Sequence, residues 1–276
     1  RNSIMQTPLI ERSVLTIAGS DSCGGAGAQA DLNTFAAFGV YGASVITAVT
    51  ARNTLGVGDF EPVSDRLIVA QIEAVLEDLP VRAIKVGSIP SVAGIAILGE
   101  LLESQATPVP LVVDPVVIEP EERKLTTGDR ALEAIQNHLI PLATDITPNL
   151  EEARVLTGLK IEDMEGMEAA AVELLARGPG AVLLKGGKFE GDAVHDILVD
   201  KNGTQLFTHS AFPGRFHGTG CALSSAIAAG LALEKSLPEA VQDAIAYVQT
   251  CLENSLAPVK GRLALLGHSP HGFRTG

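Results

Sequence analysis

The chain has 276 residues, of which 46% are hydrophobic and 4% aromatic, with 28 glycines and no tryptophan. This length can bury the core of one large domain or two small ones, and the many small residues favour helices packed closely on a sheet. The net charge of −13 argues against a nucleic-acid or anionic-membrane partner, so a small anionic ligand would need a local positive site.

The cysteines Cys23, Cys221 and Cys251 stand at wide spacings. They form no CxxC pair and no Cys/His cluster that would suggest zinc, and a disulfide framework is not expected in a chain this long. No apolar run reaches about 18 residues, and no signal segment opens the sequence. We therefore expect a cytoplasmic protein in which residues 1–12 are a tag or a disordered N-terminus.

Short β-branched runs alternate with longer helical patterns as far as residue 187. The predicted strands are 13–20, 44–50, 82–88, 110–117, 144–149 and 181–187. The predicted helices between them are 26–38, 64–79, 91–105, 126–142, 150–159 and 164–177. Because the strands are continuously apolar rather than alternating, they indicate a mainly parallel sheet covered by helices on both faces.

The pattern changes after residue 187. Residues 195–210 contain two β-rich runs around Lys-Asn-Gly, which predicts an antiparallel hairpin. Two long helical patterns follow, at 221–234 and 237–256. Since no linker or repeat interrupts the chain, we predict one α/β domain over residues 13–260 and a C-terminal tail over 261–276.

In open parallel sheets, ligands bind beyond the carboxyl ends of the strands. Polar residues follow six of the predicted strands, namely Gly19 to Asp21, Arg52 with Asn53, Lys85 to Ser88, Asp114, Asn149 with Glu152, and Lys185 to Gly187. One such residue is routine solvation, but six along one edge of a sheet indicate a binding site.

The stretch Gly-Thr-Gly-Cys at 218–221 leads directly into an alanine- and serine-rich helix. The first amides of a helix are unpaired and its dipole attracts anions, so a glycine-rich entry predicts an anion hole for a phosphate or a developing oxyanion. The same field should lower the pKa of the Cys221 thiol. On this evidence Cys221 could be a base, a nucleophile or a small buried residue.

A second glycine-rich connection, at 18–32, joins a strand to a helix but matches neither common nucleotide-binding fingerprint. Asp31 in its helical part is either a solvated surface charge or a ligand contact.

Two later motifs also carry candidate residues. Asn149 is a good helix N-cap, and Glu151 and Glu152 are either first-turn acids on the helix dipole or holders of water bound to Mg²⁺. Lys185, at the end of a buried strand, is well placed for phosphates.

Together, the segments LTIAGSD, GGAGAQADLNTFAAFGVYGASVITAVTA, VVDPVV, ITPNLEEA, LLKGG and HGTGCALSSAIAAGLA resemble the hydroxymethylpyrimidine/phosphomethylpyrimidine kinases of thiamine biosynthesis. These enzymes belong to the ribokinase-like superfamily, near the pyridoxal kinases. The resemblance covers about residues 13–257. It implies a ribokinase-like three-layer α/β/α fold with a mainly parallel central sheet and a late antiparallel hairpin. It also implies ATP- and Mg²⁺-dependent phosphorylation of a hydroxymethyl group on a pyrimidine-like ring, by a homodimer.

The resemblance further implies roles for individual residues. The implied catalytic set is Cys221 as the base, Lys185, and the anion-hole residues Gly218, Thr219 and Gly220. The implied substrate-binding set is Gly19, Asp31, Arg52, Ser88 and Val116. The implied cofactor-binding set is Asp114, Asn149 and Lys185. Asp114 and Glu152 would hold Mg²⁺, partly through water.

Three departures from the family pattern lie on the substrate side. Arg52 stands where the family usually has Gln, Ser88 where it has Met, and segment 117–125 replaces a Lys-Ser-Gly-Asp flap. Arg only donates hydrogen bonds, so a ring with carbonyl, carboxylate or anionic groups would suit Arg52 better than a neutral aminopyrimidine. The alternatives are a pyridoxine- or pyridoxal-type kinase and, from another class, a non-catalytic binding protein that kept the fold.

Overall fold

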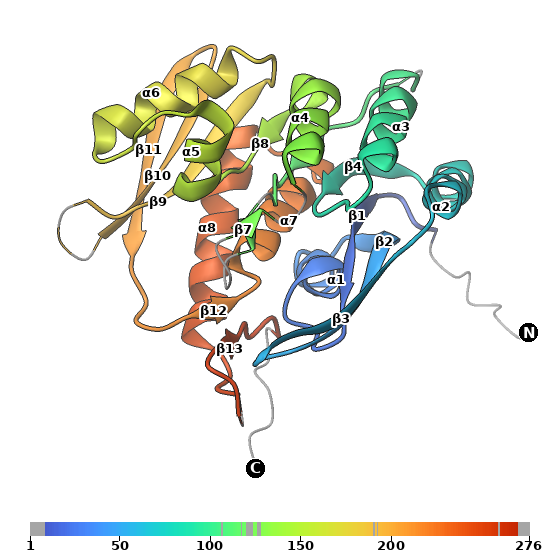
Figure 1. Cartoon of the computed structure of the whole chain (residues 1–276), viewed down its shortest axis with the longest axis horizontal. Helices are drawn as coiled ribbons and strands as arrows, with labels where there is room; N and C mark the ends of the chain where they lie inside the picture. Colours follow the sequence, from blue (N-terminus) through green and yellow to red (C-terminus); the bar gives the residue numbers. More distant parts are fainter. Residues whose placement is uncertain are drawn as a thin grey trace, which may run out of the picture.

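The computed structural model in Figure 1 describes residues 9–105, 107–116, 118–119, 124–125, 128–189, 191, 193–258 and 260–269. Three sequence predictions fall wholly or partly outside these residues. Of the predicted tag at 1–12, residues 1–8 lie outside them, and of the predicted tail at 261–276, residues 270–276 do. The third prediction is the role of segment 117–125, most of which also lies outside them.

A nine-stranded sheet forms the centre of the fold, in the order β11-β10-β9-β8-β5-β4-β1-β2-β3. Its parallel strands are β1 (Ser13–Asp21), β2 (Tyr41–Asn53), β4 (Val81–Val86), β5 (Leu111–Val113), β8 (Asp145–Ile146) and β9 (Ala181–Gly187). The strands that pair antiparallel with their neighbours are β3 (Gly56–Pro62), β10 (Ala193–Asp200) and β11 (Gly203–Ser210). The predicted parallel sheet and late hairpin are confirmed.

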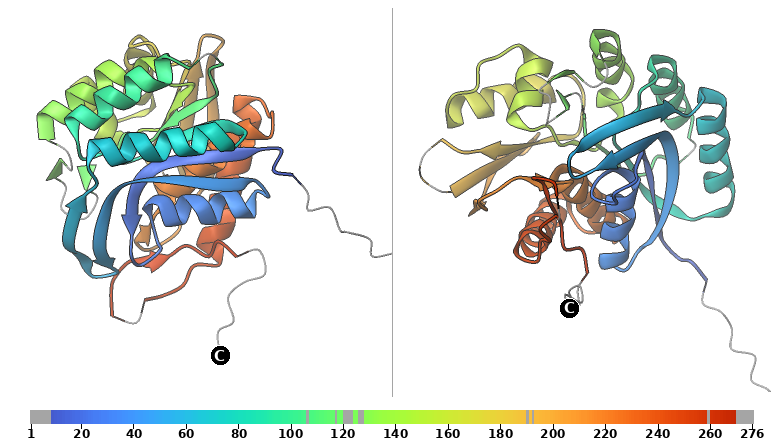
Figure 2. Two further views of the ribbon diagram at one scale, coloured as in Figure 1. Left: turned by 90° about the vertical axis from the view of Figure 1, so that its right-hand side faces the viewer. Right: turned by 60° about the horizontal axis from the view of Figure 1, so that its bottom comes forward.

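Helices cover both faces of this sheet, which gives the predicted three layers (Figures 1 and 2). One face carries α1 (Gly27–Ala37), α7 (Thr219–Ala232) and α8 (Leu237–Glu253). The other carries α2 (Asp65–Asp78), α3 (Val92–Glu103), α4 (Gly128–His138), α5 (Leu150–Thr157) and α6 (Met164–Leu175). Successive side chains of a strand point to opposite faces of the sheet. Val14 of β1 therefore packs in the core under α1, α7 and α8, and Leu15 packs in the core under α2 to α6.

Helix α7 is the element that positions the site, and its composition explains its place. Its small side chains at Ala222, Ala226 and Ala229 are fully buried, which lets it lie close to the sheet. Gly230 allows a similarly close approach to α8, because a Cβ there would lie 2.8 Å from the Cβ of Ala240. The first turn of α7 thereby reaches the carboxyl ends of the parallel strands.

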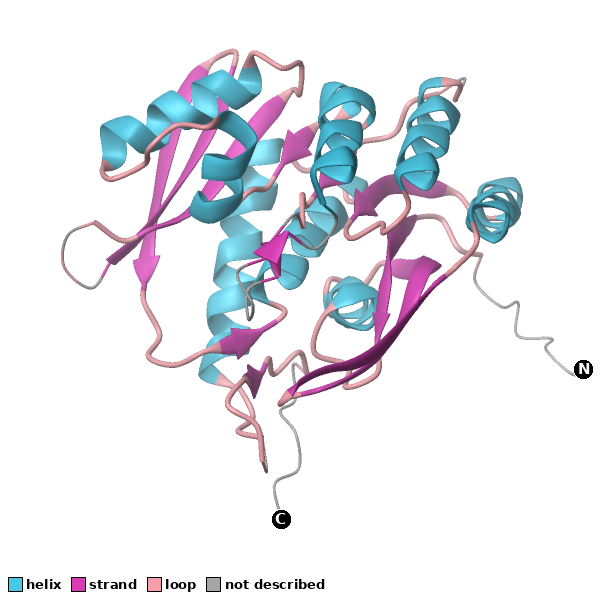
Figure 3. Ribbon diagram, in the orientation of Figure 1, coloured by secondary structure: helices cyan, strands magenta, loops and turns pink. Residues whose placement is uncertain are grey.

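Two parts of the fold differ from the sequence-based expectation. Strand β3 was not predicted, because it is an exposed edge strand without an apolar run; it extends β2 into a ribbon beyond the main sheet (Figure 3). Residues 261–269 of the predicted tail belong to the fold, since β13 (Ala264–Leu265) pairs with β12 (Phe216–His217). None of the helices in the described ranges has the length and apolar character that crossing a membrane requires.

Candidate functional site

A cleft of about 840 Å³ lies beyond the carboxyl ends of the central strands and against the first turn of α7. The structure brings most of the predicted site residues to this cleft. Those that line it are Arg52, Asp114, Val116, Asn149, Glu152, Lys185, Gly218, Thr219, Gly220 and Cys221. Gly19, Asp31 and Ser88 are not among the described residues that line it.

An ion pair between Lys185, which is partly buried, and Asp114, which is buried, lines the cleft. Lys185 Nζ donates to Asp114 Oδ1 at 3.0 Å and to the carbonyl of Thr147 at 2.5 Å. Burial opposes both charges, but Asp114 raises the pKa of Lys185, and Lys185 with Lys85 lowers the pKa of Asp114. Both side chains are therefore charged at neutral pH.

The glycine-rich entry to α7 lies directly against this ion pair. Gly218 is the N-cap in a left-handed conformation (φ 86°), and the amide of Ala222 makes the first helical bond, to the Gly218 carbonyl. The amides between them have no acceptor within the helix. A Cβ on Gly220 would lie 3.4 Å from Lys185 Nζ and 3.5 Å from Asp114 Oδ2. The amides and the lysine thus form one positive site, as an anion hole requires.

Cys221 corrects one prediction, because its pKa is raised rather than lowered. Burial raises the pKa of the thiol to about 11, although the ammonium of Lys85 and a hydrogen bond from the backbone amide of Gly27 act in the opposite direction. The loss of hydration outweighs the Lys85 charge and the Gly27 amide, and the charges of Asp31 and Asp114 also raise the pKa. The thiol is protonated at neutral pH.

Asp31 lies beneath the cleft and is fully buried, so it is not a solvated surface charge. Its carboxylate accepts hydrogen bonds from Lys85 Nζ (2.9 and 3.1 Å), Thr16 Oγ1 (2.5 Å) and Ser225 Oγ (2.7 Å). Ser225 is one turn after Cys221 on α7, so this second ion pair ties the start of α7 to α1 and β4. Lys85 was predicted only as one of the polar strand ends, and Thr16 and Ser225 were not predicted, because their partners are distant in the chain.

The two remaining predicted ring-pocket positions, Gly19 and Ser88, make backbone contacts. A Cβ on Gly27 would lie 2.2 Å from the Gly19 carbonyl, so the two glycines let β1 and the start of α1 touch. The Ser88 carbonyl accepts a hydrogen bond from Thr47 Oγ1 at 2.7 Å. Their contact with a substrate stays a prediction.

Asn149 and Glu152 form a reciprocal capping box at the start of α5, which confirms the predicted N-cap. Asn149 Oδ1 accepts from the Glu152 amide, and Glu152 Oε2 accepts from the Asn149 amide, both at 2.9 Å. Burial raises the pKa of Glu152 to about 8. The oxygens of Asp114 and Glu152, both facing the cleft, are the donor type that Mg²⁺ takes, and a bound cation would favour the ionised form of Glu152.

The far end of the cleft contains a polar cluster that the sequence argument missed. The Gly186 amide donates to Asp196 Oδ1 at 2.7 Å, and His209 Nε2 lies 3.0 Å from Asp196 Oδ2. Gln249 of α8 contacts the other ring nitrogen of His209 at 3.0 Å. Asp196 thereby fixes the left-handed turn at Gly186 that follows Lys185. The alternation of polar and apolar residues along β10 and β11 was the only sequence signal for these residues.

A third cluster joins the loop after β1 to β12. His217 Nε2 lies 2.7 Å from Asp21 Oδ2, and the Cys23 sulfur lies 3.5 Å from the same oxygen. Burial favours the neutral acid, but the hydrogen bonds from His217 and Cys23 outweigh it and lower the pKa of Asp21 to about 2. This contact holds the loop at 21–27 beside the glycine-rich entry to α7.

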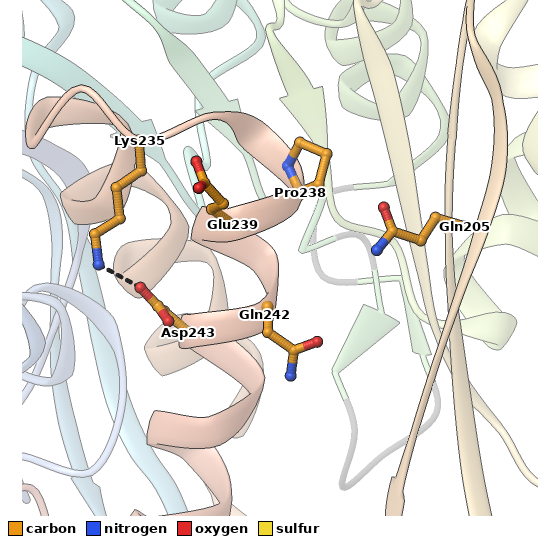
Figure 4. A pocket seen from close by; sticks show the side chains of 6 residues that line it. All are labelled: Gln205, Lys235, Pro238, Glu239, Gln242 and Asp243. Carbon is orange, nitrogen blue, oxygen red and sulfur yellow. Dashed lines mark hydrogen bonds and ion pairs between the residues drawn. The ribbon is translucent and has the colours of Figure 1, made fainter.

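Another pocket lies between β11 and the start of α8, away from these residues (Figure 4). Its charged side chains already have partners: Lys235 pairs with Asp243, and Glu239 caps α8 by accepting from the Ser236 amide. The pocket contains none of the predicted site residues, so we assign the site to the cleft.

Comparisons with known proteins show the family to which the chain belongs. A model of the family described as phosphomethylpyrimidine kinase matches residues 21–265. A hydroxymethylpyrimidine/phosphomethylpyrimidine kinase of Streptomyces coelicolor is 41% identical over 98% of this chain and 97% of its own. The crystal structure of a phosphomethylpyrimidine kinase of Clostridium difficile is similar with a TM-score of 0.78 and 45% identity, over 87% of this chain and 98% of that one. A pyridoxal kinase of Staphylococcus aureus in complex with ADP is similar with a TM-score of 0.85 and 34% identity, over 93% of each chain.

Gly218 and Gly158 provide a matched test of the tight entry to α7. Both glycines are left-handed, but a Cβ on Gly218 would lie 1.8 Å from the Gly25 carbonyl, whereas one on Gly158 would meet no described atom within 4 Å. We expect Gly158→Ala to cost about 1–2 kcal/mol of unfolding free energy from backbone strain alone. Gly218→Ala should cost about 2–6 kcal/mol, because the clash adds to the strain. Chemical denaturation measures both values, and equal costs would contradict the close contact.

Proposed function

Because the chain belongs to the phosphomethylpyrimidine kinase family, we propose that it transfers the γ-phosphoryl group of ATP to the hydroxymethyl group of a pyrimidine-like ring. The proposed substrates are hydroxymethylpyrimidine and its phosphate, in thiamine biosynthesis. One observation carries the proposal: the Lys185–Asp114 ion pair lies against Gly220 in the first turn of α7, where the amides between Gly218 and Ala222 have no acceptor within the helix. Phosphoryl transfer depends mainly on positioning and charge stabilisation, and this arrangement supplies both.

The α7 amides, Lys185 and Asp196 have separate roles in this proposal. The amides of the α7 entry and the Lys185 ammonium stabilise the charge on the oxygens of the transferring phosphoryl group. Asp196 holds the turn at Gly186, so the segment after Lys185 keeps its shape as the nucleotide binds. The complex of the similar S. aureus pyridoxal kinase with ADP supports ATP as the donor here.

Cys221 is the proposed base for the substrate hydroxyl. Only its thiolate form can accept a proton, and the raised pKa keeps that form scarce at neutral pH, while Lys85 is the charge that does most to lower the pKa. In a loose transition state, little proton removal is needed before the bond to the leaving group has broken. We therefore assign to the Cys221 thiol the orientation of the hydroxyl, and to its thiolate form, which has first lost its proton to solvent, the late acceptance of the hydroxyl proton, when the new oxygen–phosphorus bond makes that proton acidic.

Asp114 and Glu152 are the proposed holders of Mg²⁺, partly through water, with Asn149 fixing Glu152 by the capping box. Their oxygen donors fit this ion. When bound, Mg²⁺ supplies positive charge that screens the phosphates of ATP. Lys185 and the amides of the α7 entry bind and orient the transferring group.

Arg52 is the residue that bears most directly on which substrate ring the protein prefers. It lines the cleft, and its backbone is fixed by Ser22, whose hydroxyl both accepts from and donates to it. An all-donor side chain favours a ring with acceptors or an anionic group. The 34% identity to a pyridoxal kinase keeps pyridoxine and pyridoxal as the second candidates. The ring-pocket roles of Gly19, Asp31, Ser88 and Val116 belong to the same proposal.

The test is ADP release from ATP over a panel of hydroxymethylpyrimidine, its phosphate, pyridoxine and pyridoxal. We expect turnover with the pyrimidines, and an increase in kcat/KM for the uncharged aminopyrimidine in Arg52→Gln. Cys221→Ala should lower kcat by about 100-fold with little change in KM. Turnover of the pyridoxal forms alone would overturn the pyrimidine assignment. ATP binding without turnover of any ring would favour the non-catalytic alternative.

We also propose that the protein is a homodimer joined through the β2–β3 ribbon. Leu55 is 67% exposed there, and Val49, Val57 and Phe60 are about half exposed on the same ribbon. Burying this apolar surface against a second copy would stabilise the pair. Light scattering after gel filtration should give twice the chain mass, and Leu55→Glu with Phe60→Glu should give one chain mass. Leu206→Glu, at the opposite edge of the sheet, is the control and should remain dimeric; a monomeric wild type would contradict the proposal.

A further inference from the structure

Three side chains of metal-binding type converge beside the phosphoryl-transfer loop. Asp21 and Cys23 come from the loop after β1, and His217 comes from β12, 196 residues after Asp21. One ligand atom from each lies within 4.8 Å of the others. Asp21 and His217 are each more than 90% buried, and Cys23 is partly exposed. The linear spacing of the cysteines had suggested no such site, because His217 reaches it only through the fold.

We propose that Asp21, Cys23 and His217 bind a thiophilic divalent cation of the Zn²⁺ type. The proposal goes beyond the kinase function and is separate from the Mg²⁺ site proposed at Asp114 and Glu152. A thiolate, an imidazole and a carboxylate are the ligands that Zn²⁺ takes in proteins, whereas Mg²⁺ prefers oxygen alone. Three protein ligands leave the fourth tetrahedral position for water.

The distances suit this ion after a small adjustment. Tetrahedral zinc with bonds of about 2.0–2.3 Å places its ligand atoms about 3.3–3.6 Å apart. The separation of Asp21 Oδ2 and Cys23 Sγ is 3.5 Å, which already matches. The separation of Asp21 Oδ2 and His217 Nε2 is 2.7 Å, so this hydrogen-bonded pair must open by about 0.6 Å. Ligands that hydrogen-bond to one another in the metal-free protein keep the site assembled.

Two backbone amides hold the Asp21 carboxylate, in addition to the side chains of His217 and Cys23. The Cys23 amide donates to Asp21 Oδ1 at 3.0 Å, and the Ala26 amide donates to Oδ2 at 2.9 Å. When the ion replaces the contacts from His217 and Cys23, these amide bonds remain and orient the carboxylate, as outer-shell donors do in metal sites. His217 lines the cleft, so the fourth position is open to it.

The binding step balances without an oxidant or reductant. The ion accepts lone pairs from Asp21 Oδ2, the Cys23 sulfur and His217 Nε2. The thiol proton leaves to solvent, and the proton on Nε2 moves to solvent or is replaced by one on Nδ1. The fourth ligand is water from the cleft. Binding therefore releases at least one proton per ion and changes no oxidation state.

The experiment uses Co²⁺ as a spectroscopic probe for Zn²⁺, with chelator-treated, reduced protein and no nucleotide. We expect saturation at one equivalent of Co²⁺, with a thiolate-to-cobalt charge-transfer absorption in the near ultraviolet. Zn²⁺ should abolish the absorption by displacement, and excess Mg²⁺ should not. Because no turnover is measured, this result is independent of the proposed kinase activity.

Variants locate the ion. Cys23→Ser should lose the charge-transfer absorption, while Cys251→Ser, at a buried thiol, and Cys221→Ser should keep it. His217→Gln retains a hydrogen-bond donor toward Asp21, so it should fold, as circular dichroism will check, yet bind Co²⁺ at least about tenfold more weakly. The proposal is overturned by a wild type without saturable absorption, by an unchanged Cys23→Ser variant, or by loss of the absorption in Cys221→Ser.

Discussion

The ion pair between Lys185 and Asp114 is the interaction on which the rest of the site depends. Two residues 71 positions apart meet because β5 and β9 end at the same edge of one parallel sheet. Burying two charges is costly, and the pair is retained because each charge compensates the other, while the Thr147 carbonyl accepts from Lys185 and the Thr147 hydroxyl donates to Asp114. Gly220 has no side chain to cover the pair, since a Cβ there would lie 3.4 Å from Lys185 Nζ and 3.5 Å from Asp114 Oδ2.

A second buried ion pair, Lys85–Asp31, supports the first from beneath. Asp31 of α1 accepts from Lys85 of β4 and from Ser225 of α7, so this pair holds the first turns of α7 in place over the sheet. The charge of Lys85 also acts to lower the pKa of Cys221, the proposed base, and of Asp114, the partner of Lys185. The two pairs place two ammonium groups close to the start of α7 in a chain with a net charge of −13.

Much of the architecture was predictable, because continuous β-branched runs and a Gly-Thr-Gly-Cys helix entry are local signals. The Asn149 cap followed from its residue type, and the meeting of Lys185 and Asp114 followed from strand ends that share one edge. The place of Gly220 beside them was implied only by the family resemblance. The pKa of Cys221 was not predictable, since it depends on water removed by residues distant in the chain. The contact of Asp21 with His217 and the hydrogen bond of Asp196 to the Gly186 amide were also not predictable, because each joins residues that only the fold brings together. Strand β3 was missed because nothing buries it.

The central claim is that Lys185, held by Asp114 against the amides of α7, is the centre of phosphoryl transfer. The most direct measurement is the steady-state kcat for ATP-dependent phosphorylation by Lys185→Ala, with the exposed Lys160→Ala as its control and circular dichroism to verify folding. The account predicts that Lys185→Ala lowers kcat by about 100-fold or more while Lys160→Ala changes nothing. A folded Lys185→Ala variant with kcat within a few-fold of wild type would contradict it.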